Sequence, residues 1–285
     1  MKRITFVTGA TSGIGKSLVI ELLKKGGVVI GVGRSIAKLN ALEAELKALD
    51  FTHFFPIQGS LNSHEEVKAL VEKTKVLLND KKWQLTDLCH IAGQVNSKKQ
   101  RSPDNHELTF QVNHLAVVHL THQLLPFMVK ALSSRIIVIS SLSHYRARLD
   151  FNNLESLRGY NIMRAYQRSK LYNVLFVKGF SKKYSGIPIF AIDPGLVKTP
   201  IGTKQTSKLA SFIWRWRSKR GDSPLRSAKH ITTILYDPSF NQHSGAYVKH
   251  GQIVPANPLI EEAANVDRFW DITLEMLHIQ GDFGQ

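Results

Sequence analysis

The stretch that decides the fold of this 285-residue chain is Ile4-Thr5-Phe6-Val7-Thr8-Gly9-Ala10-Thr11-Ser12-Gly13-Ile14-Gly15, followed by Lys16-Ser17-Leu18-Val19-Ile20-Glu21-Leu22-Leu23. Its apolar beginning predicts a buried strand, and its last part predicts a helix with one apolar face. The glycines between them allow a sharp turn and let a ligand approach the backbone closely. A helix start offers free N–H groups and a positive dipole end, which suit a pyrophosphate. The loop from Gly9 to Gly15 is therefore predicted to bind a phosphorylated ligand, with Thr11, Ser12, Gly13 and Ile14 between its ends; a glycine-rich turn without a ligand is the alternative.

Strands and helices alternate along the rest of the chain. This rhythm predicts a doubly wound parallel α/β sheet, because right-handed crossovers permit little else. No internal repeat or low-complexity linker divides the chain, so we expect one domain over residues 1–285. The expected strands after the first are 28–33, 54–58, 85–91, 135–140, 188–192 and 246–249, and the expected helices are 36–49, one capped by Ser63 with Glu66, 106–132, 165–176, 224–236 and 265–280.

Composition limits the class of protein. Hydrophobic residues make up 43% of the chain, enough for a sizeable core, and no run of 18 apolar residues predicts a membrane span. The formal charge of +16 is spread along the whole sequence, which disfavours a nucleic-acid partner. The single cysteine, Cys89, excludes an intrachain disulfide. It fits a reducing, cytoplasmic location, and the first strand begins too early for a signal peptide.

The residues after each strand rank the candidate chemistry, because ligands of such sheets lie beyond the carboxyl ends of the strands. Arg34 follows the second strand, and no Asp or Glu occurs between Glu21 and Glu43. An acidic residue at this place would hold the ribose 2′-OH of NAD, whereas an arginine suits a 2′-phosphate. The sequence therefore favours NADP(H) over NAD(H), with Lys38 adding to the field; a solvated surface arginine is the alternative.

Tyr166 and Lys170 supply a candidate acid/base pair. They lie four residues apart in a predicted helix and so share one face. A nearby cation favours the phenolate and lowers the pKa of a tyrosine, which can then exchange a proton with a carbonyl or alcohol oxygen. Of the seven tyrosines, only Tyr166 has a lysine at this spacing.

Together these motifs resemble those of the short-chain dehydrogenase/reductase family, over nearly the whole chain. The gap between Ser141 and Tyr166, with Asp150-Phe151-Asn152-Asn153-Leu154 inside it, is similar to the retinol-dehydrogenase-like branch. The resemblance implies a Rossmann-type fold and a nicotinamide cofactor. The motifs that carry it are Thr8-Gly9-x-x-x-Gly13-x-Gly15, Ala92-Gly93, Asn113, Ser141, Tyr166-x-x-x-Lys170 and Pro194-Gly195.

The resemblance also implies roles for individual residues. Tyr166 would be the general acid/base, and Lys170 would lower its pKa and bind the nicotinamide ribose. Ser141, or less favourably Ser140, would hold the substrate oxygen. Asn113 would position a water that links Lys170 to solvent. The implied cofactor contacts are the loop from Gly9 to Gly15, Arg34, Ser60, Leu61, Ala92, Gly93, Tyr166, Lys170, Pro194, Gly195, Val197 and Thr199.

The chain departs from the family pattern at two places. Ile91 stands where the family usually has an asparagine, which puts its local hydrogen bonds in question. Ser60-Leu61 replaces the usual Asp-Leu, whose acid contacts adenine, so that contact is expected to be weaker.

Residues 201–224 interrupt the α/β rhythm. Leu209, Phe212, Ile213 and Trp216 would share one helical face, and cations surround it in 207–220. The resemblance makes this insertion a cover for the substrate; contact with a membrane surface, core packing and a homo-oligomer contact all stay open. His114, His119 and His122 do not share a helix face well, so no metal site is expected.

These observations predict an NADP(H)-dependent oxidoreductase that interconverts a carbonyl and an alcohol on an apolar substrate. A cofactor-binding regulatory protein on the same fold, with little turnover, is the first alternative. A charge-driven binder of nucleic acid or membrane is the second, and it would bind in a strongly salt-dependent way that ignores NADPH.

Overall fold

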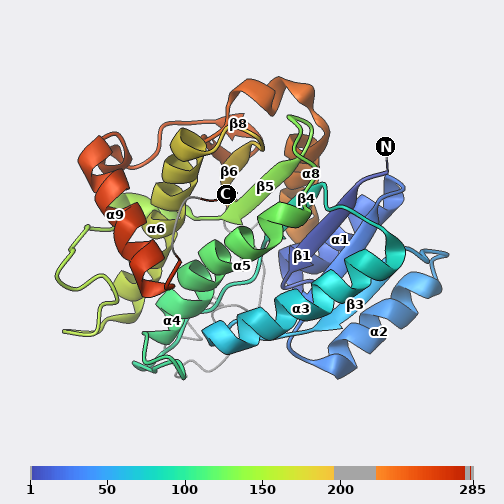
Figure 1. Ribbon diagram of the computed structural model, residues 1–285, viewed down its shortest axis with the longest axis horizontal. Coiled ribbons are helices and arrows are strands. Elements are labelled where there is room, and N and C mark those ends of the chain that lie inside the picture. The colour runs from blue at the N-terminus through green and yellow to red at the C-terminus, as the bar shows by residue number, and fades with distance from the viewer. Residues whose placement is uncertain (1, 196–222, 280–282, 284–285) are drawn as a thin grey trace.

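The computed structural model describes residues 2–195, 223–279 and 283 of the chain. The strands of this part form one eight-stranded sheet in the order β3-β2-β1-β4-β5-β6-β7-β8 (Figure 1). Neighbouring strands are parallel except β7 and β8, which pair antiparallel. The doubly wound parallel sheet is thereby confirmed, and the antiparallel edge strand β8 was not expected. The strands are β1 Ile4–Thr8, β2 Val28–Gly33, β3 Phe54–Gln58, β4 Asp87–His90, β5 Arg135–Ile139, β6 Ile189–Asp193, β7 Tyr247–Lys249 and β8 Gln252–Ile253.

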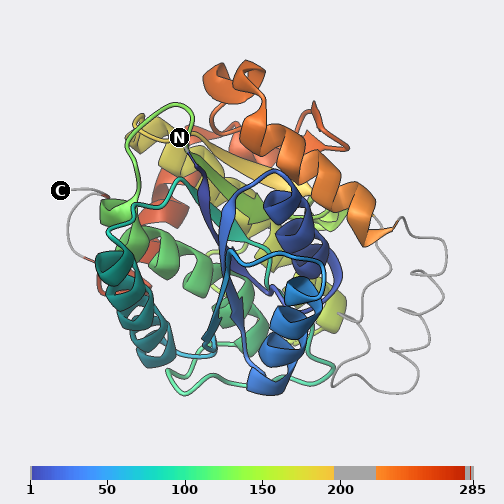
Figure 2. The same cartoon turned by 90° about the vertical axis from the view of Figure 1, so that its right-hand side faces the viewer.

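Helices cover both faces of the sheet and make a three-layer molecule. Helices α1, α2 and α8 lie on one face, and α3, α5 and α6 lie on the other (Figure 2). Helix α9 packs on the outside of α6 (Figure 1). The helices are α1 Gly13–Lys24, α2 Ile36–Lys47, α3 His64–Lys81, α4 Leu108–Phe110, α5 Ala116–Leu124, α6 Ile162–Lys183, α8 Pro224–Tyr236 and α9 Ala263–Met276.

An apolar core lies on each face of the sheet. Side chains alternate between the two faces of a strand, so that Phe6 belongs to one core and its neighbour Val7 to the other. Both are fully buried. The near-continuous apolar runs of the central strands follow from this, because each strand must present apolar side chains to helices on both sides.

The helix expected over 106–132 is shorter and broken. It consists of α4, the π-helical turn η1 Gln111–Leu115, α5 and the 3-10 turn η2 Leu125–Phe127. Pro126 lies in the first positions of η2, and Met128 is already extended. Proline lacks the N–H that a helix needs and crowds the preceding turn, which ends the helix five residues before the predicted end.

The predicted cap of α3 is confirmed in a modified form. Ser63 Oγ accepts a hydrogen bond from Glu66 N at 3.1 Å, as a capping box requires. The Glu66 carboxylate, however, accepts from Asn62 N at 3.0 Å and from Ser60 Oγ at 2.6 Å. The glutamate thus stabilises the segment before the cap rather than the cap residue itself.

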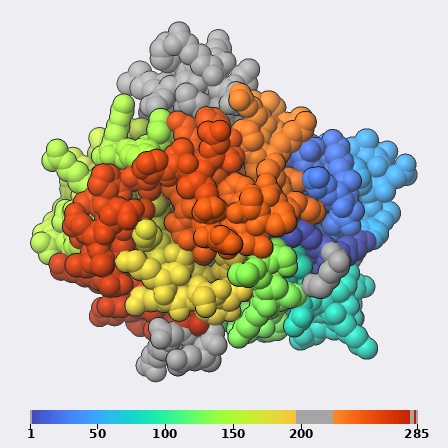
Figure 3. Space-filling view, turned by 90° about the horizontal axis from the view of Figure 1, so that it is seen from above, coloured from blue at the N-terminus to red at the C-terminus, as the bar shows by residue number. Residues whose placement is uncertain are grey.

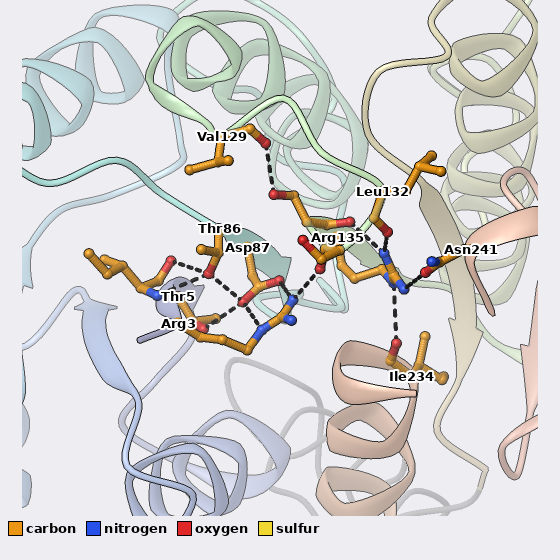
Figure 4. Close-up of polar contacts among 12 residues, drawn as sticks. Arg3, Thr5, Thr86, Asp87, Val129, Leu132, Arg135, Ile234 and Asn241 are labelled. Carbon is orange, nitrogen blue, oxygen red and sulfur yellow. Dashed lines mark hydrogen bonds and ion pairs between the residues drawn. The ribbon is translucent and has the colours of Figure 1, made fainter. Parts of the chain in front are cut away.

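Buried polar side chains gather where β1, β4 and β5 begin, at the edge opposite the strand ends that carry the motifs (Figure 4). Arg3 pairs with Asp87, which is fully buried and also accepts from Thr5 Oγ1 at 3.0 Å and from Thr86 Oγ1 at 2.8 Å. Arg135 is 1% exposed. These contacts fix the strand starts, because a buried charge is tolerated only with such partners.

The later part of the chain covers one side of the molecule. Seen from above, the segments from α8 (orange) to α9 (red) lie beside one another, next to the blue N-terminal elements (Figure 3). Of the predicted insertion 201–224, residues 201–222 lie outside the described residues. Over the described part, every helix is too short or too polar to span a bilayer.

Candidate active site

A cleft opens at the carboxyl ends of β1 to β4, where the strand order reverses between β1 and β4. It holds about 770 Å³ of empty space, open solvent included. Of the residues predicted to bind the cofactor, those that line this cleft are Gly9, Thr11, Ser12, Arg34, Leu61, Ala92 and Gly93.

The glycine loop turns through backbone conformations that favour glycine. Gly9 and Gly13 adopt φ values of +70° and +54°, which disfavour any other residue. Ser12 precedes α1 without a side-chain cap, and no acidic side chain stands in the first turn of that helix. Its N-terminal N–H groups and positive dipole end are therefore suited to an anion.

Three predicted loop residues support the cleft without lining it. Gly13, Ile14 and Gly15 form the first turn of α1, and Ile14 packs into the core. A Cβ atom at Gly15 would lie 2.2 Å from the carbonyl oxygen of Gly9. Glycine is thus required at position 15 for the helix to approach its own loop.

The hydroxyl of Thr8 ties together the ends of β1 and β4. It accepts hydrogen bonds from Ile91 N and Ala92 N, both at 3.0 Å. Both bonds use the backbone of residues 91 and 92, so they are kept although Ile91 replaces the expected asparagine. The Ile91 side chain packs against the core beside α1 instead.

Basic and polar side chains form the far end of the cleft. Arg34 and Lys38 are exposed and line it together with Asn62. Arg34 Nη1 lies 3.5 Å from Gln94 Oε1, and Gln58 Nε2 donates to Arg34 O at 3.2 Å. Among the described residues, no acidic side chain lines the cleft. This composition suits a phosphate group.

Ser60, by contrast, is not among the residues that line the cleft. Its hydroxyl donates to Glu66 Oε2 at 2.6 Å and accepts from Asn62 N at 3.3 Å. The neighbours Gly59, Leu61 and Asn62 face the cleft in its place.

Tyr166 and Lys170 lie one turn apart near the start of α6, as the spacing predicts. They are 8% and 2% exposed. Lys170 Nζ lies 5.7 Å from the centre of the Tyr166 ring and donates to Ile139 O at 3.0 Å. Burial lowers the pKa of Lys170 to about 8, because charge is disfavoured away from water.

The two serines after β5 have different surroundings. Ser140 is 1% exposed, and its hydroxyl donates to Lys170 O at 2.8 Å. Ser141 is only partly buried; its Oγ accepts from Ser143 N and donates to Ser143 Oγ, each at 3.2 Å. It begins the 3-10 turn η3 Leu142–Arg146. The geometry leaves Ser141 available to a ligand and engages Ser140 with α6.

Asn113 lies in the π-helical turn η1 and joins the cleft to α6. Its amide clasps the backbone of Gln94, accepting from Gln94 N at 2.8 Å and donating to Gln94 O at 2.9 Å. It also donates to Ser169 Oγ at 3.1 Å. The side chain thus joins Gln94 to Ser169 of α6, the neighbour of Lys170 in sequence.

Pro194 and Gly195 follow β6 at the same edge of the sheet. Gly195 N donates to Asp193 Oδ1 at 2.9 Å, and Gly195 adopts φ +76°. Asp193 is buried and also accepts from Tyr247 OH at 3.1 Å. The turn after β6 is therefore held by its own strand; Val197 and Thr199 lie outside the described residues.

The three histidines of the middle helical segment make contacts with the core. His114 is fully buried between Asn173 and Thr273, and His119 packs against His64. Within the described ranges, no three metal-ligating side chains are placed to hold an ion.

The sequence motifs do not point to several residues that line the cleft, among them Ser35, Asn62, Gln94 and Val112. The Ser35 side chain caps α2 by accepting a hydrogen bond from Lys38 N at 3.4 Å. The sequence pattern Ser-x-x-Lys does not reveal this cap. Asn62 and Gln94 stand just after the predicted strand ends, which was the only available signal. Val112 faces the cleft because of the π-helical turn, which shifts the side chains of this segment.

Comparison with known proteins places these features among relatives. A family model described as "short chain dehydrogenase" matches residues 3–210. Human retinol dehydrogenase 13 is 33% identical, over 94% of this chain and 82% of the relative. Retinol dehydrogenase 12 of Bos taurus is 27% identical, over 98% of this chain and 87% of the relative. The NADPH-bound carbonyl reductase from chicken fatty liver has the same fold, with a TM-score of 0.65, 22% identity, and coverage of 90% of this chain and 99% of that chain.

Proposed function

The chain belongs to the short-chain dehydrogenase family, and from this premise we propose that it is an NADP(H)-dependent oxidoreductase that interconverts a carbonyl and an alcohol on an apolar substrate. The observation that carries the proposal is the pair Tyr166 and Lys170 on one turn of α6, which bonds at Lys170 to the end of β5 just before Ser141. The names of the retinol dehydrogenase relatives support an apolar substrate. The basic end of the cleft supports a 2′-phosphate.

Residues of this chain would move the proton and hold the reacting oxygen. The hydroxyl of Ser141 donates to the substrate oxygen and fixes its place. The Tyr166 hydroxyl gives its proton to a carbonyl oxygen, or its phenolate takes one from an alcohol. The Lys170 ammonium stabilises that phenolate, because an opposite charge nearby lowers the pKa of the phenol.

The glycine loop and the basic end of the cleft support NADP(H) as the cofactor. The loop from Gly9 to Gly15 would hold the pyrophosphate, and Arg34 with Lys38 would hold the 2′-phosphate. When bound, the cofactor supplies or accepts a hydride at its nicotinamide C4. Further contacts would come from Leu61, Ala92, Gly93, Pro194, Gly195, Val197 and Thr199, with Lys170 on the nicotinamide ribose.

The test of this proposal is Tyr166→Phe, followed by NADPH oxidation at 340 nm with a broad panel of apolar carbonyls. General acid catalysis contributes about 10²–10⁴-fold, so we expect a rate loss of that order. NADPH binding, followed by its fluorescence, should be nearly unchanged. Tyr184→Phe is the matched control, because Tyr184 directly follows the other end of α6 and its hydroxyl has no hydrogen-bond partner in the structure. Full activity of Tyr166→Phe would refute the assignment.

A cofactor-binding regulatory protein is the second candidate. The engagement of Ser60 with Glu66, away from the cleft, favours it because an adenine contact of the family is then absent. This candidate predicts NADPH binding by the native chain without oxidation across the whole carbonyl panel, and Tyr166→Phe would then change neither measurement.

A further inference from the structure

His144 is a buried imidazole that joins the Ser141 turn to a distant segment. It is 0% exposed and lies in η3, three residues after Ser141. His144 Nδ1 lies 2.7 Å from Ser141 O, and Nε2 accepts from Asn257 N at 3.1 Å. A backbone N–H can only donate, so Nε2 is unprotonated and the hydrogen resides on Nδ1. The neutral ring therefore bridges two segments that are 113 residues apart in sequence.

The contacts of Asn257 hold it in place to bond to His144. It is 4% exposed and caps the 3-10 turn η6 Pro258–Ile260, where its Oδ1 accepts from Leu259 N at 3.0 Å. Its Nδ2 donates to His144 O at 2.9 Å. Backbone and side chain of Asn257 thus both bond to His144, and the segment after β8 is attached to η3 at two points.

Aromatic rings hold the imidazole in this orientation. The ring centres of Tyr145 and Tyr247 lie 4.1 Å and 4.5 Å from that of His144. The charged group that acts on it is the carboxylate of Asp193, which accepts from Tyr247 OH. Burial lowers the pKa of His144, while the bond to Ser141 O and the charge of Asp193 act in the opposite direction. The net lowering keeps the ring neutral, as its two hydrogen bonds require.

We propose that His144 is a positioning residue, which fixes the direction of the Ser141 hydroxyl by bonding to Ser141 and Asn257 at once. This inference rests on the proposed function, in which Ser141 holds the substrate oxygen. Ser141 Oγ bonds within the turn to Ser143, so its direction follows the geometry of η3. A displacement of about 1 Å in such a group can cost on the order of 100-fold in rate.

Two amide substitutions at His144 test its bond to Ser141 and its bond to Asn257 separately. The amide of His144→Asn can reach Ser141 O, and that of His144→Gln can reach Asn257 N, but neither reaches both. We expect kcat to fall about tenfold or more in each, with the Kd for NADPH unchanged. His119→Gln is the control, since His119 is another buried histidine, 3% exposed, in α5. Wild-type kcat in either amide variant would overturn the bridge.

A second cycle tests whether His144 acts through Ser141. In a Ser141→Ala background, His144→Asn should cause no further loss of kcat, because the hydroxyl that it positions is gone. A purely structural role would lower kcat by the same factor in both backgrounds. That additive result would overturn the proposal even if both single variants lose activity.

A readout without turnover keeps this inference distinct from the proposed function. Hydrogen exchange of the peptides that contain residues 141–147 and 254–260 should become faster in both segments of His144→Asn, relative to His119→Gln. Absence of any carbonyl turnover by the wild type would refute the proposed function alone. Unchanged exchange in the 254–260 peptide would refute the bridge, whatever the activity.

Discussion

The side chain at position 34 adds to the positive charge at one end of the cleft. Arg34 and Lys38 lie at the cleft with Asn62, and its lining contains no acid in the part of the chain that the structure describes. Arg34 could be predicted from the sequence, because it directly follows the predicted strand 28–33. Asn62 could not, because it turns toward the cleft only through the way Glu66 holds the segment before α3.

Removal of a positive charge at this end of the cleft should weaken the binding of NADPH but not that of NADH. Arg34→Gln loses a cation that would face the 2′-phosphate, so the Kd for NADPH should rise about tenfold, equivalent to about 1.4 kcal/mol. The Kd for NADH, which has no such phosphate, should stay within about twofold. Lys47→Gln, in the last turn of α2 and thus at the other end of the helix that follows Arg34, serves as the control. Equal losses for both cofactors in a fluorescence titration would contradict the assignment.

Gly15 leads to a prediction about the close contact between α1 and the loop before it. Gly15→Ala would bring a Cβ to 2.2 Å from Gly9 O, so the loop or the helix must move. We expect NADPH affinity to fall more than tenfold and the melting temperature to drop. The control is Gly26→Ala, at φ +76° with no atom within 4 Å of the added Cβ, which tests backbone strain alone. If both variants bind NADPH alike, crowding at Gly15 is irrelevant to the site.

At the scale of elements, regular periodicity was sufficient for the strands β1 to β7 and for the long helices, but their ends depended on contacts, and β8 was not predicted. The segment 106–132 shows why. Its apolar pattern predicted one helix, whereas a π-helical turn at Asn113 and the proline at 126 divide it. The π-helical turn lets the Asn113 side chain bond to the backbone of Gln94. No local sequence pattern predicts a bond between residues 19 positions apart. The same holds for His144 and Asn257.

Arg135 links three elements and yields a prediction about stability. Its guanidinium donates to Leu132 O, to Ile234 O in the last turn of α8 at 3.3 Å, and to Asn241 (Figure 4). Arg135→Met would leave buried acceptors without donors, so the free energy of unfolding should fall by about 3 kcal/mol. Urea denaturation measures this.

The location of Arg135 predicts that its substitution changes stability but not cofactor affinity. It begins β5, at the edge of the sheet opposite the cleft, so NADPH affinity should be preserved in Arg135→Met. The control is Arg101→Gln, an exposed arginine whose Nη1 bonds only to Asn105. If Arg135→Met lost no more stability than the control, the buried contacts of Arg135 would contribute nothing to the free energy of unfolding.

For the whole molecule, the buried histidines predict instability in acid. Burial lowers the pKa of His90 and His114 to about 3 and that of His119 to about 4. Below a pH of about 6.5, the ordinary pKa of histidine, the unfolded chain therefore binds protons that the folded chain does not. Stability is lost as the pH falls from there toward 4, by about 1.4 kcal/mol per pH unit for each histidine.

Denaturation curves at pH 7.5, 6 and 5 would measure this loss. The three histidines together give a slope of about 4 kcal/mol per pH unit. His114→Gln should reduce the slope by about 1.4 kcal/mol per pH unit, and His53→Gln, at an exposed position, serves as the control. Constant stability between pH 6.5 and 5 would contradict the burial of these rings.

One of the two apolar cores unites the earliest and the latest parts of the sequence. Ile4 and Phe6 belong to the same core as Trp270 of α9 and Phe283, whose ring lies 5.1 Å from that of Trp270. During synthesis on a ribosome, this core stays incomplete until residue 283 has left the exit tunnel. The aromatic face of α6 is uncovered for that interval, so the nascent polypeptide offers chaperones a binding surface until residue 283 has emerged.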